Sequence, residues 1–260
     1  MKSTAINRLE SLLDASRLGG SLARAWIGQP APAGVSTGLP DLDDALGGGW
    51  RVGEISEVVG ARSTGRTTVL IATLAAATAR GDIGALVDAW DRFDPVSAAA
   101  AGVDLDRLLW VRGPALTVTL ELARPAVLQQ AIQRAIRAFD LIVRAGGFGI
   151  VALDLAGAPA RALQALPFTT WLRLAHANEG RQTAGLVIAE RPLGRSARGA
   201  CVQLAAAPRW TGASAQSRRF NGFHLRADVN VDLKHRSIRH RPGTPTGRSL
   251  CQSIDRSIDR

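Results

Sequence analysis

The sequence contains few or no residues of three types, tyrosine, histidine and cysteine. Its 260 residues include no tyrosine, four histidines and only two cysteines, Cys201 and Cys251. Two cysteines cannot form a disulfide framework or a cysteine metal cluster, and the histidines lack the spacing of metal ligands. These scarcities exclude a small disulfide-stabilised domain and a structural zinc site.

Long apolar segments are also missing. No apolar run reaches the ~18 residues that a membrane-spanning helix needs. Residues 1–18 contain no apolar segment of the kind found in signal peptides. We therefore predict no membrane partner and a cytoplasmic location.

Acidic residues are scarce in the second part of the chain. Residues 1–159 contain 15 basic and 16 acidic residues, whereas residues 160–260 contain 17 basic and 6 acidic residues. Such an asymmetry points to a polyanionic partner, and to nucleic acid before membrane, because no basic amphipathic helix accompanies it. A solvated basic surface with a disordered tail is the alternative and stays open.

The hydrophobic pattern predicts strands and helices that alternate from residue 36 to about 210. This is typical of an α/β fold with a mostly parallel central sheet, with antiparallel strands toward the C-terminus. The expected strands are 54–60, 83–89, 107–113, 148–154 and 183–190, and the expected helices are 67–80, 94–102, 124–139 and 168–180. Two further segments, 201–210 and 223–235, alternate like exposed antiparallel strands.

The same pattern predicts three parts of the chain. Residues 1–33 are an amphipathic helix and a Pro/Gly linker, residues 34–241 are the core domain, and residues 242–260 are a disordered basic tail. The apolar stripe of the N-terminal helix either packs on its own domain or docks onto a partner, including a second copy of the chain. Both interpretations stay open.

The segment VVGARSTGRTT, residues 58–68, nearly matches a phosphate-binding P-loop. The template requires Gly, four free residues, Gly, Lys and then Ser or Thr, and Arg66 stands in place of the lysine. Arginine keeps the positive charge, but its planar fork is larger than an ammonium group. The candidate phosphate-binding residues are Gly60, Ser63, Thr64, Gly65, Arg66, Thr67 and Thr68. An ordinary glycine-containing turn between a strand and a helix is the alternative.

One acidic residue fits a second part of a P-loop site. Asp154 ends the apolar strand 148–154, where P-loop proteins keep an acid that helps to hold Mg²⁺. Any strand can end in aspartate, so Asp154 is a magnesium-ligand candidate only in combination with the loop.

Two long blocks resemble the bacterial RecA recombinase core. They are STGLPDLDDALGGGWRVGEISEVVGARSTGRTT (36–68) and LVDAWDRFDPVSAAAAGVDLDRLLWVRG (86–113). The resemblance extends in weaker form from about residue 36 to 235 and implies a RecA-like P-loop fold. It also implies ATP and Mg²⁺ as cofactors. Weak binding of both and no binding of either are equally open.

The chain departs from the RecA pattern where that family handles ATP. Trp90 stands in the place of the catalytic glutamate, and strand alternation predicts that Asp91 points to the opposite face. Ser97 replaces the adenine-stacking tyrosine, and Glu190 replaces the glutamine that senses the γ-phosphate. Asp94 remains as a candidate beside the adenine. With Arg66, these departures imply that hydrolysis is lost, so we predict no catalytic residue.

The place of the family's second DNA-binding loop is taken by RPLGRSARG, residues 191–199. Its arginines Arg191, Arg195 and Arg198 suit contacts with DNA phosphates, and simple solvation is the alternative. Trp210 and Phe220 are candidates for stacking on single-stranded bases, although packing in the core is the preferred interpretation of both.

These features favour a RecA-like protein of DNA repair that binds single-stranded DNA and has a degenerate ATP site. The resemblance is greatest in character to the ImuA-type accessory proteins, which implies a bacterial, nucleoid-associated factor in damage-induced translesion synthesis. Its partner would then be a translesion polymerase or a related repair protein. Two alternatives are an ATP-dependent recombinase that forms filaments on DNA, and a regulatory protein such as a division inhibitor without DNA binding.

Overall fold

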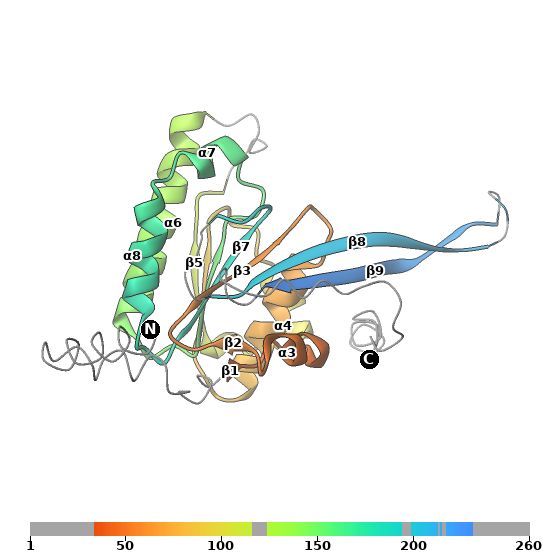
Figure 1. Cartoon of the computed structure of the whole chain (residues 1–260), viewed down its shortest axis with the longest axis horizontal. Helices are drawn as coiled ribbons and strands as arrows, with labels where there is room; N and C mark the ends of the chain where they lie inside the picture. Colours follow the sequence, from red (N-terminus) through yellow and green to blue (C-terminus); the bar gives the residue numbers. More distant parts are fainter. Residues whose placement is uncertain (1–33, 116–123, 194–198, 213, 215–216, 231–260) are drawn as a thin grey trace, which may run out of the picture. The chain divides into compact units, whose positions relative to one another are not determined.

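The computed structural model describes residues 34–115, 124–193, 199–212, 214 and 217–230 (Figure 1). For residues 208–209 and 220–225 it describes the backbone alone. The N-terminal helix and the basic tail expected from the sequence lie outside these residues.

A seven-stranded sheet forms the centre of the fold. The strands are, in spatial order, β5 (Leu108–Arg112), β4 (Gly84–Asp88), β6 (Ile150–Asp154), β7 (Ala184–Ala189), β3 (Ile55–Gly60), β8 (Cys201–Thr211) and β9 (Arg219–Asn230). All neighbours pair in parallel except β8 and β9, which are antiparallel. This confirms the α/β fold with a mostly parallel sheet and antiparallel strands toward the C-terminus.

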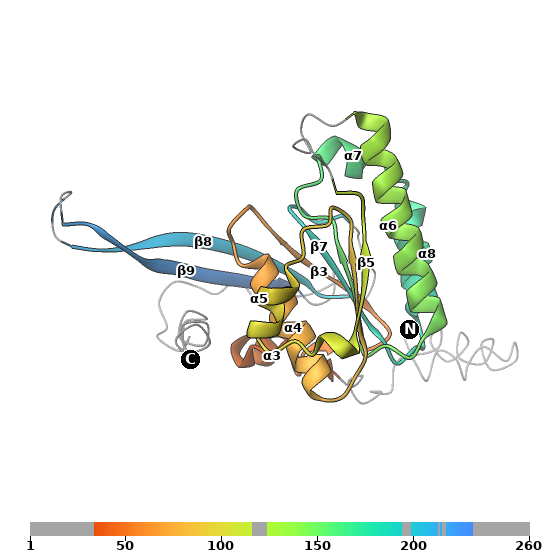
Figure 2. The same ribbon diagram turned by 180° about the vertical axis from the view of Figure 1, so that it is seen from behind.

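Helices cover both faces of the sheet (Figures 1 and 2). One face carries α3 (Pro40–Leu46), α4 (Arg66–Ala79) and α5 (Pro95–Ala100), and the other carries α6 (Pro125–Ala145), α7 (Ala160–Gln164) and α8 (Phe168–Asn178). A 3₁₀ turn at Leu105–Arg107 leads into β5. Such a three-layer arrangement is what alternating strands and crossover helices produce.

Each central strand supplies side chains to two separate cores, because successive residues of a strand point to opposite faces. In β4, Leu86 belongs to the core under α3, α4 and α5, and Val87 belongs to the core under α6, α7 and α8. Strands buried on both faces read as continuous apolar runs, which is why the sequence predicted them well.

Two predicted elements need correction. The helix expected at 124–139 continues to Ala145, because Ile142 and Val143 keep its apolar stripe in the core until Gly146 ends it with a φ of 72°. The segment 201–210 is not simply an exposed antiparallel strand. It pairs in parallel with β3 as well, and its residues Val202 and Leu204 are buried.

The sequence did not predict α7, α3 or the short hairpin of β1 (Gly34–Val35) and β2 (Trp50–Arg51). Side-chain hydrogen bonds hold this region together. The Asp43 carboxylate accepts from the Ser36 hydroxyl at 2.6 Å and from the Thr37 amide at 2.7 Å. The fully buried Trp50 donates through Nε1 to the Thr73 hydroxyl at 3.1 Å.

Candidate functional site

The glycine-rich loop joins the end of β3 to the start of α4 at the carboxyl edge of the parallel strands. Two glycines fix its shape. A Cβ on Gly60 would lie 2.5 Å from Oγ1 of Thr64 and 2.6 Å from the carbonyl oxygen of Leu204, and Gly65 has a left-handed φ of 93°. The Thr64 hydroxyl donates to the Ala61 carbonyl oxygen at 2.8 Å and closes the turn. The loop is therefore compact, and its glycines are structural requirements.

The N-terminus of α4 offers backbone N–H groups to an anion. Among the described residues no side chain caps its first turn, and Ser63, Thr67 and Thr68, in or next to this turn, are exposed. Uncapped N–H groups and the positive end of the helix dipole make such a terminus a binding site for phosphate. The backbone therefore fits the phosphate chain of a nucleotide.

Arg66, the first residue of α4, is turned toward the neighbouring strand β7 and is 9% exposed. Its Nη2 lies 3.9 Å from Oε1 of Glu190, whereas its buried Nη1 has no hydrogen-bond partner among the residues described. Burial lowers the pKa of the guanidinium, and the charges of Glu190 and Asp154 oppose this. Glu190, which replaces the γ-phosphate-sensing glutamine of the RecA pattern, is thus not an isolated anion, because it forms an ion pair with Arg66.

Acidic residues lie at or directly after the ends of three adjacent strands beside the loop. Asp88 of β4 and Asp154 of β6 are register partners, and Glu190 follows the last residue of β7. Burial, together with the charge of Asp88, raises the pKa of Asp154 to about 6, although the Ala156 amide donates to its carboxylate at 2.8 Å. Within the described part of the chain, no three His, Cys, Asp or Glu side chains form a metal cluster. That Thr67 and Asp154 hold Mg²⁺ together with the phosphates of a bound nucleotide stays a prediction.

Asp88 is a residue that the sequence reasoning missed. It is 2% exposed, and its carboxylate accepts from the backbone amides of Trp90, Arg92 and Phe93 at 3.2, 2.6 and 2.7 Å. These bonds shape the turn after β4. The signal was present in VDAWDRF, because a short polar side chain directly after a buried strand often bonds to the backbone ahead of it.

Trp90 and Asp91 lie in the turn that follows β4. Trp90 is 4% exposed and packs in the core under α6 and α8. The expected strand alternation of Asp91 is wrong, since β4 ends at Asp88 and Asp91 has a left-handed φ of 55°. Asp91 accepts two hydrogen bonds from Arg112, at 2.7 and 2.8 Å, which lower the pKa of its carboxyl. The Arg112 guanidinium also lies 4.7 Å from the centre of the Trp110 ring.

The adenine-side candidate Asp94 caps the N-terminus of α5. Its carboxylate accepts from the amides of Val96 and Ser97 at 3.2 and 3.3 Å and also from the Ser97 hydroxyl. The Ser97 hydrogen bond holds the pKa of Asp94 below its usual value. Asp94 therefore has a structural task, and a role beside adenine stays a prediction.

The candidate DNA contacts are only partly described. Arg191 is exposed directly after Glu190, whereas Arg195 and Arg198 lie outside the described residues. Trp210 is 50% exposed, so the preferred interpretation of core packing is wrong for this residue. Its register partner on β9 is Phe220, whose side chain is outside the described part of the structure.

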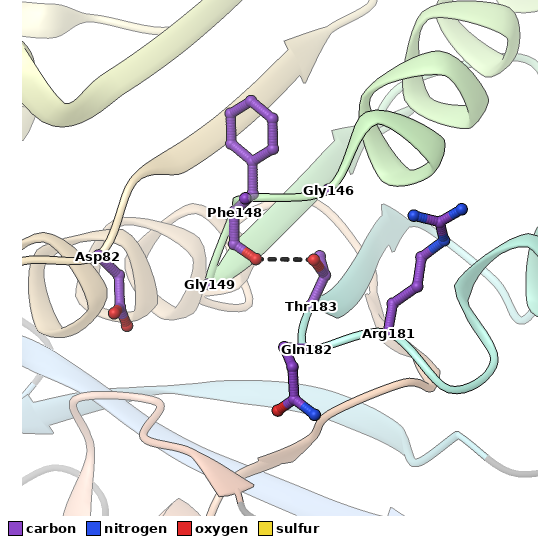
Figure 3. A pocket seen from close by; sticks show the side chains of 8 residues that line it. Asp82, Gly146, Phe148, Gly149, Arg181, Gln182 and Thr183 are labelled. Carbon is purple, nitrogen blue, oxygen red and sulfur yellow. Dashed lines mark hydrogen bonds between the residues drawn. The ribbon is translucent and has the colours of Figure 1, made fainter.

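A pocket of about 380 Å³ lies at the opposite, amino edge of the parallel strands (Figure 3). Its polar side chains hold the fold together. Arg181 donates through Nε to the Ala177 carbonyl oxygen at 2.7 Å, Thr183 donates to the Phe148 carbonyl oxygen at 2.7 Å, and Asp82 pairs with Arg80 at 2.8 Å. The pocket is separate from the glycine-rich loop and its acidic neighbours.

The sheet order, the crossover helices and the glycine-rich turn after β3 define a RecA-like P-loop core. Residues 28–157 match the RecA N-terminal domain family, which is half of the chain, and the protein belongs to this family. Among the helices of the described segments, none has the length and apolar character to cross a membrane.

Several RecA proteins are similar to this chain over part of its length. The protein RecA of Prochlorococcus marinus strain MIT 9211 is 38% identical over 99 residues, which are 38% of this chain and 27% of that protein. The protein RecA of Clostridioides difficile strain 630 is 36% identical over 121 residues, which are 46% of this chain and 30% of that protein. The chain thus spans less than a third of the relatives that it matches.

Proposed function

We propose that this protein is a RecA-like, DNA-binding accessory factor of DNA repair whose P-loop holds phosphate without hydrolysing ATP. The observation that carries the proposal is the position of Trp90. A buried indole follows β4 where a nucleotidase would need a group to activate water, and an indole N–H cannot accept a proton.

The carboxylates near the loop do not replace the missing base. Asp88 accepts from three backbone amides, and Asp91 is held by Arg112. Glu190 pairs with the Arg66 guanidinium, and Asp154, which accepts from the Ala156 amide, is the proposed magnesium ligand. A general base must have a lone pair within reach of the water that it activates, and the interactions of these carboxylates hold them in other positions or occupy part of their lone pairs.

A bound nucleotide would contact the protein mainly through the loop. The first-turn amides of α4 would donate to its phosphates. A shift of the Arg66 side chain would add Nη1, which is buried and has no hydrogen-bond partner among the described residues. Thr67 and Asp154 would hold a magnesium ion, which when bound neutralises part of the phosphate charge. ATP and Mg²⁺ therefore remain proposed ligands of the protein and not reactants.

The hairpin of β8 and β9 supports the proposed contact with single-stranded DNA. Its strands are 11 and 12 residues long and extend beyond the rest of the sheet (Figure 1). Arg218, Arg219 and Arg226 are exposed along it, as is Trp210. Exposed arginines bind phosphates without sequence choice, and an exposed indole can stack on unpaired bases.

The finer role rests on the resemblance to ImuA-type proteins. On this proposal a translesion polymerase or a related repair protein is the partner, in a bacterial cytoplasm and near the nucleoid. Residues 1–33 would serve association, residues 34–241 would form the core domain, and residues 242–260 would add basic charge beside DNA.

ATP turnover by the full chain, measured with and without single-stranded DNA, tests the proposal. We expect no DNA-stimulated hydrolysis, together with salt-sensitive binding of labelled single-stranded DNA. A RecA-like, DNA-stimulated rate would instead establish the ATP-dependent recombinase. Hydrolysis and DNA binding both absent at low salt would favour a regulatory protein without DNA binding.

A further inference from the structure

The ion pair of Arg66 and Glu190 connects the P-loop to the neighbouring strand. β3 and β7 are parallel and adjacent, with Val59 opposite Ala189, so the residues that follow them lie side by side. Glu190 is the residue after β7, and its carboxylate reaches to 3.9 Å from Nη2 of Arg66. An anion supplied by the chain itself therefore stands beside the loop.

The position of the Glu190 carboxylate bears on how many phosphates of a nucleotide the loop can hold. The cation that follows the second glycine of a P-loop contacts the outer phosphates of a nucleotide. Here one side of the Arg66 guanidinium already faces a carboxylate, and Asp154 and Asp88 continue the row of acidic groups along the same sheet edge. A third phosphate would have to displace Glu190 or lie against it.

The inner phosphates of a bound nucleotide would lie near hydrogen-bond donors and not near a carboxylate. The first-turn amides of α4 are uncapped, and Nη1 of Arg66 is buried and lacks a hydrogen-bond partner within the described segments. A buried donor without an acceptor is costly, so a movement of the Arg66 side chain that brings Nη1 to a phosphate oxygen is favoured. The site thus combines donors for a short phosphate chain with an anion where a longer chain would end.

We propose that Glu190 makes this loop selective for nucleoside diphosphates over nucleoside triphosphates. The inference rests on the proposed function, in which the loop holds a nucleotide without hydrolysing it. Glu190 takes the interaction with Arg66 that a terminal phosphate would otherwise make. The acidic sheet edge adds to the discrimination, because like charges at short range inside a protein repel strongly.

Equilibrium binding of ADP and ATP to the full chain, in the presence of Mg²⁺, tests this selectivity. We expect the wild-type protein to bind ADP at least about tenfold more tightly than ATP, since a terminal phosphate meets a carboxylate at a partly buried site. In Glu190→Gln, ATP affinity should rise by about tenfold and ADP affinity should change by less than about threefold, because the neutral amide no longer repels phosphate.

Glu179→Gln is the matched control, because it makes the same change on the residue after α8, at the opposite edge of the sheet. It should leave the ratio of the two affinities unchanged. Equal wild-type affinities for ADP and ATP, the same ratio in Glu190→Gln as in the wild type, or binding of neither nucleotide would each overturn the proposal. The wild-type ratio requires no variant, so a folding defect in Glu190→Gln does not remove the test.

Single-stranded DNA binding and ATP turnover of the same samples separate this inference from the proposed function. If the wild-type protein binds DNA and does not hydrolyse ATP, but shows no preference for ADP over ATP, only the role of Glu190 is overturned. DNA-stimulated ATP turnover would overturn the accessory function, whatever the affinity ratio.

Discussion

At the scale of single residues, Trp90 is the largest departure from a site that could hydrolyse ATP. A large apolar ring occupies the turn where the carboxyl edge of the sheet meets the core under α6 and α8. Its Nε1 is buried and has no hydrogen-bond partner among the residues that the structure describes. The ring therefore contributes packing and not polar chemistry.

The substitution Trp90→Glu tests this packing role. We expect it to lower the free energy of unfolding by about 3–5 kcal/mol, because it removes a buried aromatic ring and places a carboxylate in the core. Urea unfolding followed by circular dichroism measures the change. Trp210→Glu is the control: it starts from a side chain that is 50% exposed, so its cost should stay below about 1 kcal/mol. Equal costs for the two variants would contradict the buried position of Trp90.

The residue scale also shows a limit of sequence reasoning. The departures at Arg66 and Glu190 were interpreted as two separate losses from an ATP site, although the structure pairs the two side chains. Their contact depends on β3 and β7 being neighbours, and local patterns do not encode which strands become neighbours in a sheet. The hydroxyls and glycines of the loop were predictable because a strand, a turn and a helix are local features.

At the scale of elements, the loop depends on the close approach of β3 to β8. Gly60 ends β3, and a Cβ at this position would lie 2.6 Å from the carbonyl oxygen of Leu204, which is backbone and cannot move aside cheaply. Glycine is therefore required here by the neighbouring strand as well as by the loop.

We expect Gly60→Ala to lower the free energy of unfolding by about 2 kcal/mol or more, because β8 or the Thr64 side chain must shift. It should also weaken nucleotide binding by displacing the first residue of the loop. Gly84→Ala in β4 is the matched control, since its Cβ would meet side chains at ordinary distances of 3.4–3.6 Å. Denaturant midpoints of the two variants give the comparison, and a Gly60→Ala protein as stable as wild type would refute the steric argument.

The main elements were predictable from the sequence, and their exceptions have physical causes. Apolar runs located β3, β4, β6 and β7 because these four strands are buried on both faces. The short helix α7 and the β1–β2 hairpin have too few residues to show a period. The parallel pairing of β8 with β3 was missed because it joins segments far apart in the chain.

At the scale of the whole molecule, basic charge is concentrated in residues 160–260, which contain 17 basic and 6 acidic residues. In the described part, exposed arginines of this region include Arg191 and those of the β8–β9 hairpin. Charge spread over a long hairpin suits a polymer of phosphates better than a small ligand.

The double substitution Arg218→Ala, Arg219→Ala should weaken single-stranded DNA binding and make it less sensitive to salt. Each lost phosphate contact should reduce the slope of log affinity against log salt by about 0.7. Fluorescence anisotropy of labelled DNA over a salt series measures both quantities. The double substitution Arg134→Ala, Arg137→Ala removes the same charge from exposed positions on α6 and should change neither. A larger effect of the α6 substitutions than of the hairpin substitutions would place DNA on the face of the sheet that α6 covers.

The strand order has a consequence for how the protein is made. β3 and the loop that follows it are translated before both sheet partners of β3, because β7 and β8 lie in residues 184–211. During synthesis, β3 stays without its neighbours until these later strands have left the ribosome, and pairing between distant segments is slow. The glycine-rich loop is thus completed only when these later strands have paired with β3.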